Sequence, residues 1–258
     1  MAVDNNMLQD YYSDDKLEKY AAACVDLKSP SISTRYYTLY SSLPSLKDKT
    51  VLDLPCGLGF KARKFILEYK ASKVVGVDIV QKQLDVSRQL DVKAGVQDGQ
   101  IEYVCHDAKI AKEICQADIC VAVHLFCFAK NFDELVSMAS CLIMNLKQGG
   151  QCYSLSCSLS KEDKQTIIQL FQTFDYFASR VDPLPDEILV PRRLIYSNEG
   201  FNYDMYAWDA EAIKKAFIMA GFSRVELVPY KADPEYSGPY NLEEYMKTVD
   251  GQVVIAVK

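Results

Sequence analysis

The chain has 258 residues, of which 49% are hydrophobic and 25% charged, as is typical of a globular domain that can bury a sizeable core. Its formal net charge is −6, which weighs against a surface that binds the phosphates of nucleic acid. The first residues lack the regions of a signal peptide and the most apolar run is too short to span a membrane, so we expect a cytoplasmic protein without a membrane partner.

Strand-like and helix-like patterns alternate through the middle of the chain. The predicted strands cover 49–54, 73–78, 100–107, 117–123 and 151–158, and the predicted helices between them cover 61–69, 81–90 and 132–146. Gly149 and Gly150 mark the boundary before the fifth strand. Strands separated by helices predict right-handed crossovers and a parallel sheet that is covered on both faces.

The two ends of the chain depart from this alternation. We expect the first 48 residues to be helical, and the long aromatic, proline-containing segment after strand five to be an insert. Asp209 and Gly221 are typical caps of a helix over 209–222. The strands predicted at 224–230 and 252–258 are joined by an irregular segment, which is unlike a crossover helix and favours an antiparallel hairpin.

These patterns predict one doubly wound α/β domain over residues 1–258, with a Rossmann-like mixed sheet of seven strands. Its parts are an N-terminal helical cap at 1–48, a sheet core at 49–157, a cap insert at 158–208, and a last helix with a C-terminal hairpin at 209–258.

The stretch VLDLPCGLGF, residues 51–60, ends the first strand in a glycine loop. Gly57, Gly59 and Ala62 satisfy the loose glycine pattern of dinucleotide-binding loops. A pyrophosphate, however, prefers backbone N–H donors, whereas Asp53 would repel it and Pro55 removes a donor. A ligand with a cationic group and no phosphate fits better, and S-adenosylmethionine carries an α-ammonium group.

Two further acids end the next two predicted strands. Asp78 ends the second strand, where a carboxylate can accept hydrogen bonds from two ribose hydroxyls. Asp107 ends the third strand and can accept from an adenine amino group. Because the ends of parallel strands meet at one edge, three such acids predict an adenosine-bearing ligand more strongly than the glycines alone.

The strings VLDLPCGLGF, VVGVD, YVCHDA and LKQGG, in this order, resemble the motifs of class I S-adenosylmethionine-dependent methyltransferases. The runs AVHLFCFA and YDMYAWDAEAIKKAFIMAGF are similar to small-molecule N-methyltransferases of the toxoflavin-pathway type. The resemblance implies a seven-stranded sheet with one antiparallel strand and S-adenosylmethionine as cofactor. The candidate cofactor-binding residues are Asp53, Pro55, Gly57, Gly59, Phe60, Asp78, Ile79, Gln83, His106, Asp107, Ala108 and Ala122.

Histidines are scarce, and His124 follows the fourth predicted strand at the edge where chemistry is expected. It is either an acid–base group that titrates near neutrality or a wall residue bonded to the backbone. Tyr11, in the predicted N-terminal helical cap, would close over the methyl group of S-adenosylmethionine. His124 and Tyr11 are therefore the candidate catalytic residues. An aromatic cage suits a cationic amine or a sulfonium, although most of the aromatic rings in the predicted cap segments can also serve in packing. The candidate substrate-binding residues are Tyr20, Phe128, Tyr196, Tyr203 and Tyr206.

The predicted function is methylation of a small molecule at nitrogen by in-line transfer. O-methylation, a catalytically inactive binding protein and an NAD-dependent oxidoreductase are the alternatives, although Tyr12 and Lys16, which have oxidoreductase spacing, precede the first strand. The segment after strand four lacks the Asn/Asp-Pro-Pro-aromatic motif of enzymes that methylate nucleic acids. The nine cysteines are scattered without a C-x-x-C pair, which predicts reduced thiols and no metal site. Oligomeric state is not indicated.

Overall fold

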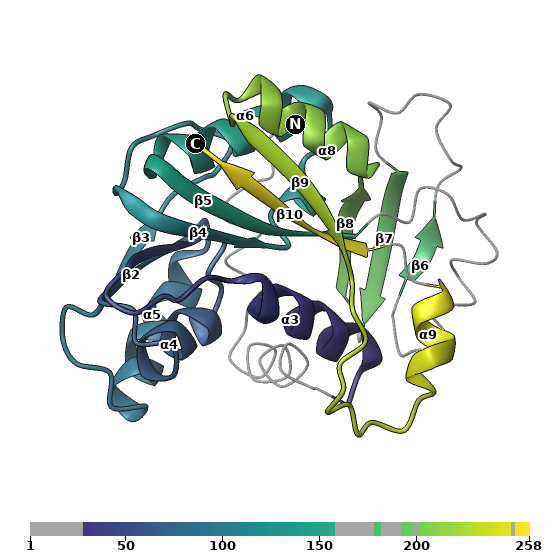
Figure 1. The fold of residues 1–258 in the computed structure, drawn as a ribbon, viewed down its shortest axis with the longest axis horizontal. Coiled ribbons are helices and arrows are strands. Elements are labelled where there is room, and N and C mark those ends of the chain that lie inside the picture. The colour runs from purple at the N-terminus through teal and green to yellow at the C-terminus, as the bar shows by residue number, and fades with distance from the viewer. Residues whose placement is uncertain (1–27, 158–177, 182–191, 199–200, 249–250) are drawn as a thin grey trace.

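The computed structural model describes residues 28–157, 178–181, 192–198, 201–248 and 251–258. Its main feature is a seven-stranded sheet in the order β3-β2-β1-β4-β5-β10-β9 (Figure 1). The strands are β1 Thr50–Asp53, β2 Lys73–Asp78, β3 Ile101–Cys105, β4 Ala117–Val123, β5 Leu146–Cys157, β9 Arg224–Pro229 and β10 Gly251–Val257. The predicted doubly wound fold with seven strands is confirmed.

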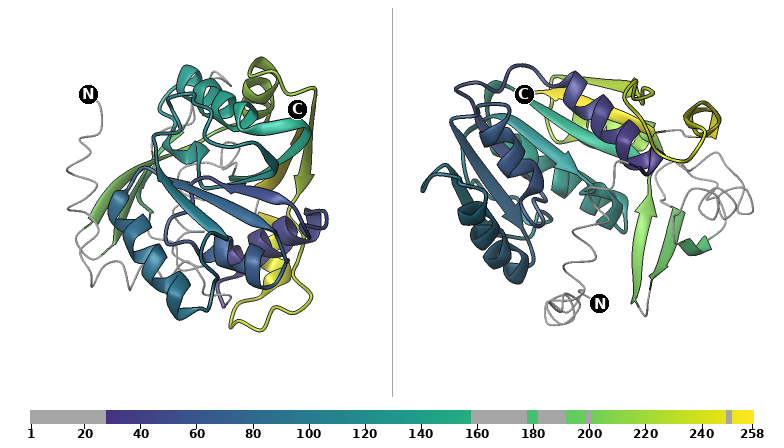
Figure 2. Two further views of the ribbon diagram at one scale, coloured as in Figure 1. Left: turned by 90° about the vertical axis from the view of Figure 1, so that its left-hand side faces the viewer. Right: turned by 90° about the horizontal axis from the view of Figure 1, so that it is seen from below.

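Helices cover both faces of this sheet, as Figures 1 and 2 show. The helices are α3 Pro30–Ser42, α4 Phe60–Leu67, α5 Gln81–Lys93, α6 Phe132–Met144, α8 Ala210–Met219 and α9 Leu242–Thr248, with the 3₁₀ turn η1 at Phe126–Phe128. Helices α6 and α8 lie on one face, whereas α3, α4 and α5 lie on the other. Helix α3 confirms the predicted N-terminal helical cap over residues 30–42. The part of this cap before residue 28 lies outside the described residues.

The alternation of side chains along β1 explains why both faces need cover. Leu52 packs into the core beneath α6 and α8, while its neighbour Val51 packs into the core beneath α3 and α4. Both are fully buried. Apolar side chains on both faces are typical of a parallel strand that lies between two layers of helices.

The C-terminal hairpin is confirmed, with two additions. Strand β10 runs antiparallel to both β5 and β9, so the antiparallel strand lies between them and β9 forms the edge. The segment before β10, which the sequence analysis treated as irregular, contains α9. Asp209 caps α8 by accepting from the Glu211 amide at 2.8 Å, and Gly221 follows the helix with a φ of 104°, as predicted.

Two local predictions were wrong. The glycine pair 149–150 lies inside β5, which begins at Leu146, and the register of β4 against β5 shifts beside it. Residues 178–207 also contain a second sheet, β6 Ala178–Val181, β7 Arg192–Asn198 and β8 Phe201–Ala207, where no strands are predicted from the sequence. The signal was present, because two alternating runs separated by two residues are typical of a hairpin. Their mixed polar and aromatic composition obscured it.

Candidate active site

Four segments that the sequence analysis singled out leave the sheet at the same edge. Strand β1 is parallel to β2 and β4, with Asp53 opposite Gly76 on one side and Val121 on the other. Strand β2 is parallel to β3, and Asp78 lies opposite Cys105. The segments after β1, β2, β3 and β4 therefore begin side by side, as expected for a ligand site at the ends of parallel strands.

Asp78 holds the glycine loop against the end of β2. Its carboxylate accepts from the Gly57 amide at 2.8 Å and from the Val80 amide at 3.0 Å, and the Cys56 amide donates to the Val77 carbonyl at 2.9 Å. Burial raises the pKa of Asp78, although the hydrogen bonds from Val80 and Gly57 oppose that shift. A carboxylate can accept about four hydrogen bonds, so Asp78 retains capacity for ligand hydroxyls.

Both loop glycines are required by the backbone. Gly57 and Gly59 have φ values of 54° and 71°, in the left-handed region that side chains disfavour. A Cβ atom on Gly59 would also lie 2.3 Å from the hydroxyl oxygen of Tyr103 and 2.9 Å from a guanidinium nitrogen of Arg63. Neighbouring side chains thus fill the space on this side of the loop.

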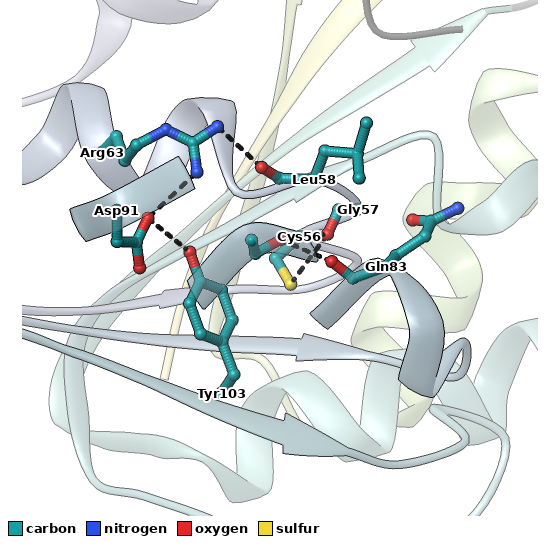
Figure 3. A network of polar contacts seen from close by, with 8 residues as sticks. Cys56, Gly57, Leu58, Arg63, Gln83, Asp91 and Tyr103 are labelled. Carbon is teal, nitrogen blue, oxygen red and sulfur yellow. Dashed lines mark hydrogen bonds and ion pairs between the residues drawn. The ribbon is translucent and has the colours of Figure 1, made fainter. Parts of the chain in front are cut away.

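These neighbours form a buried brace beneath the loop, drawn in Figure 3. Arg63 on α4 donates to the Leu58 carbonyl at 2.7 Å and pairs with Asp91 on α5 at 3.0 Å. Tyr103 on β3 donates to the same carboxylate oxygen at 3.2 Å. Sequence patterns alone do not indicate these three residues, because each lies outside the glycine motif and only the folded sheet brings them together.

Asp53 forms a buried ion pair that the sequence analysis did not predict. Lys61 Nζ lies 3.3 Å from Asp53 Oδ1, and Asp53 is fully buried. Burial raises the pKa of Asp53 to about 6, against the opposing charge of Lys61. Burial acts to lower the pKa of Lys61, but the Asp53 carboxylate raises it above the usual range. The cation that Asp53 was expected to find in a ligand is thus already supplied in part by the chain itself.

The other candidate cofactor residues surround the same edge. Strand β3 ends at Cys105, so His106, Asp107 and Ala108 lie in the following loop instead of ending the strand. Asp107 accepts from the Lys109 amide at 2.9 Å, and the His106 ring lies 2.7 Å from the Ile110 carbonyl. The remaining candidates are Pro55 and Phe60 flanking the glycine loop, Ile79 after β2, buried Gln83 on α5 and buried Ala122 within β4.

His124 directly follows β4 and adopts a φ of 59°, which is uncommon for a residue with a side chain. The surrounding protein and the positive charges of Arg35 and Lys61 lower the pKa of His124. Solvent reaches the exposed imidazole, which limits the effect of burial. The direction of the shift still leaves His124 neutral at about pH 7.

The second sheet meets this part of the site at η1. Phe128 of η1 is 45% exposed, and Trp208 after β8 donates to the Ala129 carbonyl at 3.1 Å. Tyr206 is half-buried on β8. The backbones of Tyr196 and Tyr203 lie opposite each other in the β7–β8 pair, but their side chains lie outside the described residues. Tyr11 and Tyr20 also lie outside them.

The core of the chain resembles a known family in sequence. Residues 51–150 match the family described as "Methyltransferase domain". This match covers less than half of the chain. A curated, uncharacterized protein of Haemophilus influenzae is 29% identical over 135 residues, which cover 52% of this chain and 53% of that protein. The match thus spans about half the length of this relative.

Solved structures with distant sequences share the fold of this chain. A candidate S-adenosylmethionine-dependent methyltransferase of Listeria monocytogenes has a TM-score of 0.66 at 17% identity, over 88% of this chain and 97% of that chain. An S-adenosylmethionine-dependent methyltransferase of Mesorhizobium loti gives 0.58 at 17% identity, over 89% and 100%. The glycopeptide N-methyltransferase MtfA, solved with S-adenosylmethionine, gives 0.56 at 12% identity, over 90% and 94%. The predicted Rossmann-like methyltransferase fold is confirmed.

The matched family model agrees with the predicted enzyme class, and one solved structure with this fold contains S-adenosylmethionine. The residues at the strand ends fit this group. The oxygens of Asp53 accept no well-aligned hydrogen bond from the described residues, which suits an ammonium partner, and Asp78 has capacity for hydroxyls. No described helix is long and apolar enough to cross a membrane. Within the same residues, no group of three or more His, Cys, Asp or Glu side chains is arranged to hold a metal ion.

Proposed function

We propose that this protein is an S-adenosylmethionine-dependent methyltransferase that methylates a small molecule at nitrogen. The observation that carries the proposal is the junction of the glycine loop with Asp53 and Asp78 at one edge of a methyltransferase domain. When bound, S-adenosylmethionine supplies an electrophilic methyl carbon to the acceptor lone pair, and the carbon–sulfur bond breaks with its electrons left on sulfur.

The chain contributes alignment more than acid–base chemistry. Asp78 offers its free acceptor capacity to the ribose hydroxyls, and the loop around Asp107 and Ala108 receives the adenine. Asp53 receives the ammonium group of the methionine end. We assign the same face of the loop to Pro55, Phe60, Ile79, Gln83, His106 and Ala122. Fixed positions for both reactants lower the entropic part of the barrier, which is the main need of an in-line displacement.

The lowered pKa of His124 favours nitrogen over oxygen as the acceptor atom. A histidine whose pKa is lowered is a weak base at neutral pH, so it is poorly suited to deprotonate a hydroxyl. The charges of Arg35 and Lys61 that disfavour imidazolium also disfavour a protonated amine at the same place. A weakly basic amine, already neutral in water, meets these conditions, and His124 orients it through a hydrogen bond.

The proposal of a small-molecule acceptor rests on the net charge of the chain and on the second sheet, formed by β6, β7 and β8. The net charge of −6 is unfavourable for a polyanionic acceptor. Strand β8 packs beside η1 and so adjoins the loop of His124. We propose that residues 1–48 and 158–208 cap the 49–157 core within one domain. Tyr11 closes over the methyl group, and Tyr20, Phe128, Tyr196, Tyr203 and Tyr206 line the acceptor site.

The decisive experiment is incubation with methyl-labelled S-adenosylmethionine and a fractionated extract of small molecules. We expect a labelled product one methylene heavier than its precursor. Reactions with the Asp78→Ala variant are the matched control, because that variant retains the cap but loses the ribose ligand. A panel of aromatic amines, phenols, peptides and RNA then separates the alternatives. Preference for a phenol would contradict methylation at nitrogen, and preference for peptide or RNA would contradict a small-molecule acceptor.

A further inference from the structure

The ion pair between Asp53 and Lys61 is buried beside the glycine loop but is loosely bonded. Asp53 is fully buried and Lys61 is 8% exposed. Their charged atoms are 3.3 Å apart, and neither oxygen of Asp53 accepts a well-aligned hydrogen bond from the described residues. Lys61 Nζ also lies 3.3 Å from the Pro55 carbonyl oxygen. Within the described part of the chain, both groups therefore retain unused hydrogen-bonding capacity.

Buried charges are costly unless they are paired and hydrogen-bonded. The raised pKa of Asp53, which follows from its burial, indicates that Lys61 compensates this cost only in part. A ligand that brings one positive and one negative group would give each side chain a second partner. An α-amino acid is such a ligand, because its ammonium and carboxylate groups are separated by a single carbon.

We propose that the Asp53–Lys61 pair recognises the zwitterionic amino acid end of S-adenosylmethionine, with Lys61 donating to its carboxylate. The inference rests on the proposed function and adds to it a specificity-determining residue that lies outside the glycine motif. The position of Lys61 agrees with this role. It is the second residue of α4, whose N-terminus follows the glycine loop and favours anions.

The test compares two ligands that differ only in the carboxylate. S-adenosylmethionine carries it, and decarboxylated S-adenosylmethionine retains the ammonium group without it. Calorimetry with both ligands on the wild-type protein and on Lys61→Met gives a ratio of affinities for each protein. We expect the wild type to prefer the carboxylate-bearing ligand by roughly 10- to 100-fold, as for a hydrogen bond to a charged group. In Lys61→Met the ratio should fall to about one.

Removal of Lys61 alone leaves a buried carboxylate without its partner and can impair folding. The double variant Asp53→Asn/Lys61→Met removes both charges and keeps the two side chains similar in size. Its ratio should also be about one. Lys64→Met is the matched control, because Lys64 lies one turn further along α4 and pairs with Glu68. Its ratio should equal that of the wild type.

The outcomes separate this inference from the proposed function. If the wild type binds neither ligand, the proposed function falls and the inference with it. If the wild type binds both ligands equally, or if Lys61→Met weakens both by the same factor, Lys61 is only a counterion of Asp53. Either of these two results overturns the inference but leaves the proposed function standing.

Discussion

The loops that follow β1 and β4 leave the sheet side by side but are built in opposite ways. In the first loop, glycines adopt the left-handed backbone. Asp78 accepts a hydrogen bond from this backbone, and Arg63 and Ser87 donate hydrogen bonds to it. In the second loop, His124 itself takes the left-handed conformation, and its side chain and that of Phe128 are exposed. The first loop thus offers mainly backbone groups to a ligand, whereas the second offers side chains.

This difference separates two tasks. A cofactor that never changes is best held by a fixed backbone surface, which tolerates little substitution. An acceptor is selected by side chains, which can differ without disturbing the sheet. Substitutions in the first loop should therefore damage cofactor binding and stability, and substitutions in the second should mainly change turnover.

The largest effect is expected for Gly59→Ala. The new Cβ would meet the Tyr103 hydroxyl at 2.3 Å and would stand on a left-handed backbone. We expect a loss of cofactor affinity of on the order of a hundredfold or more, and a stability loss of roughly 1–3 kcal/mol. Calorimetry and thermal unfolding measure the two effects.

The Gly95→Ala variant separates the effect of a left-handed backbone from the effect of steric overlap at the new Cβ atom. Gly95 has a similar φ of 74°, but nothing lies within 4 Å of the position that its Cβ would take. This variant should lose a little stability and no cofactor affinity. If Gly59→Ala behaves in the same way, the brace beneath the first loop is not what requires glycine.

The next largest effect is expected for Asp78→Ala. This change removes two ligand hydrogen bonds in the proposed site and also releases the Gly57 and Val80 amides. Because each hydrogen bond to a charged group contributes about 1.5–3 kcal/mol, affinity for S-adenosylmethionine should fall at least about a hundredfold.

Asp118→Ala is the matched control for Asp78→Ala. Asp118 also accepts from a backbone amide, that of Thr50 at 2.9 Å, but it lies at the opposite end of β4. This variant should be less stable than the wild type and bind the cofactor normally. An affinity change of less than about threefold for Asp78→Ala would remove Asp78 as the ribose ligand.

The smallest effect on binding is expected for His124→Asn, which tolerates the left-handed backbone. Cofactor affinity should stay within about twofold, while turnover falls. The pKa of His124 is lowered in the folded protein, so the unfolded chain binds a proton more readily. The stability linked to His124 is complete above the ordinary histidine pKa and declines as the pH falls below about 6.5.

Thermal unfolding of the wild type and of His124→Asn between about pH 4 and 8 measures this linkage. The wild type should lose more stability than the variant on the acid side. His106 is present in both proteins and cancels from the difference. Equal losses in the two proteins would show that His124 titrates normally, and a base role in O-methylation would then regain support.

The sequence by itself determined the order of the seven strands of the main sheet and of the helices α4, α5, α6 and α8 between them, because the apolar periodicity of each segment directly reports which faces are buried. It also determined the glycine loop and the acid that ends β2, since a left-handed turn and a strand end are local features. The same local signals determined the helix caps at Asp209 and Gly221.

Only the tertiary structure decided which side chains support the loop. Arg63, Asp91 and Tyr103 come from three different elements and meet beneath Gly59, and no periodic pattern encodes such a contact. In the sequence, nothing distinguishes Lys61 from an ordinary lysine on a helix, yet packing buries it against Asp53. Periodicity reports burial one segment at a time, whereas the pairing of buried polar groups depends on how segments dock. That is why the acids were predicted and their partners were not.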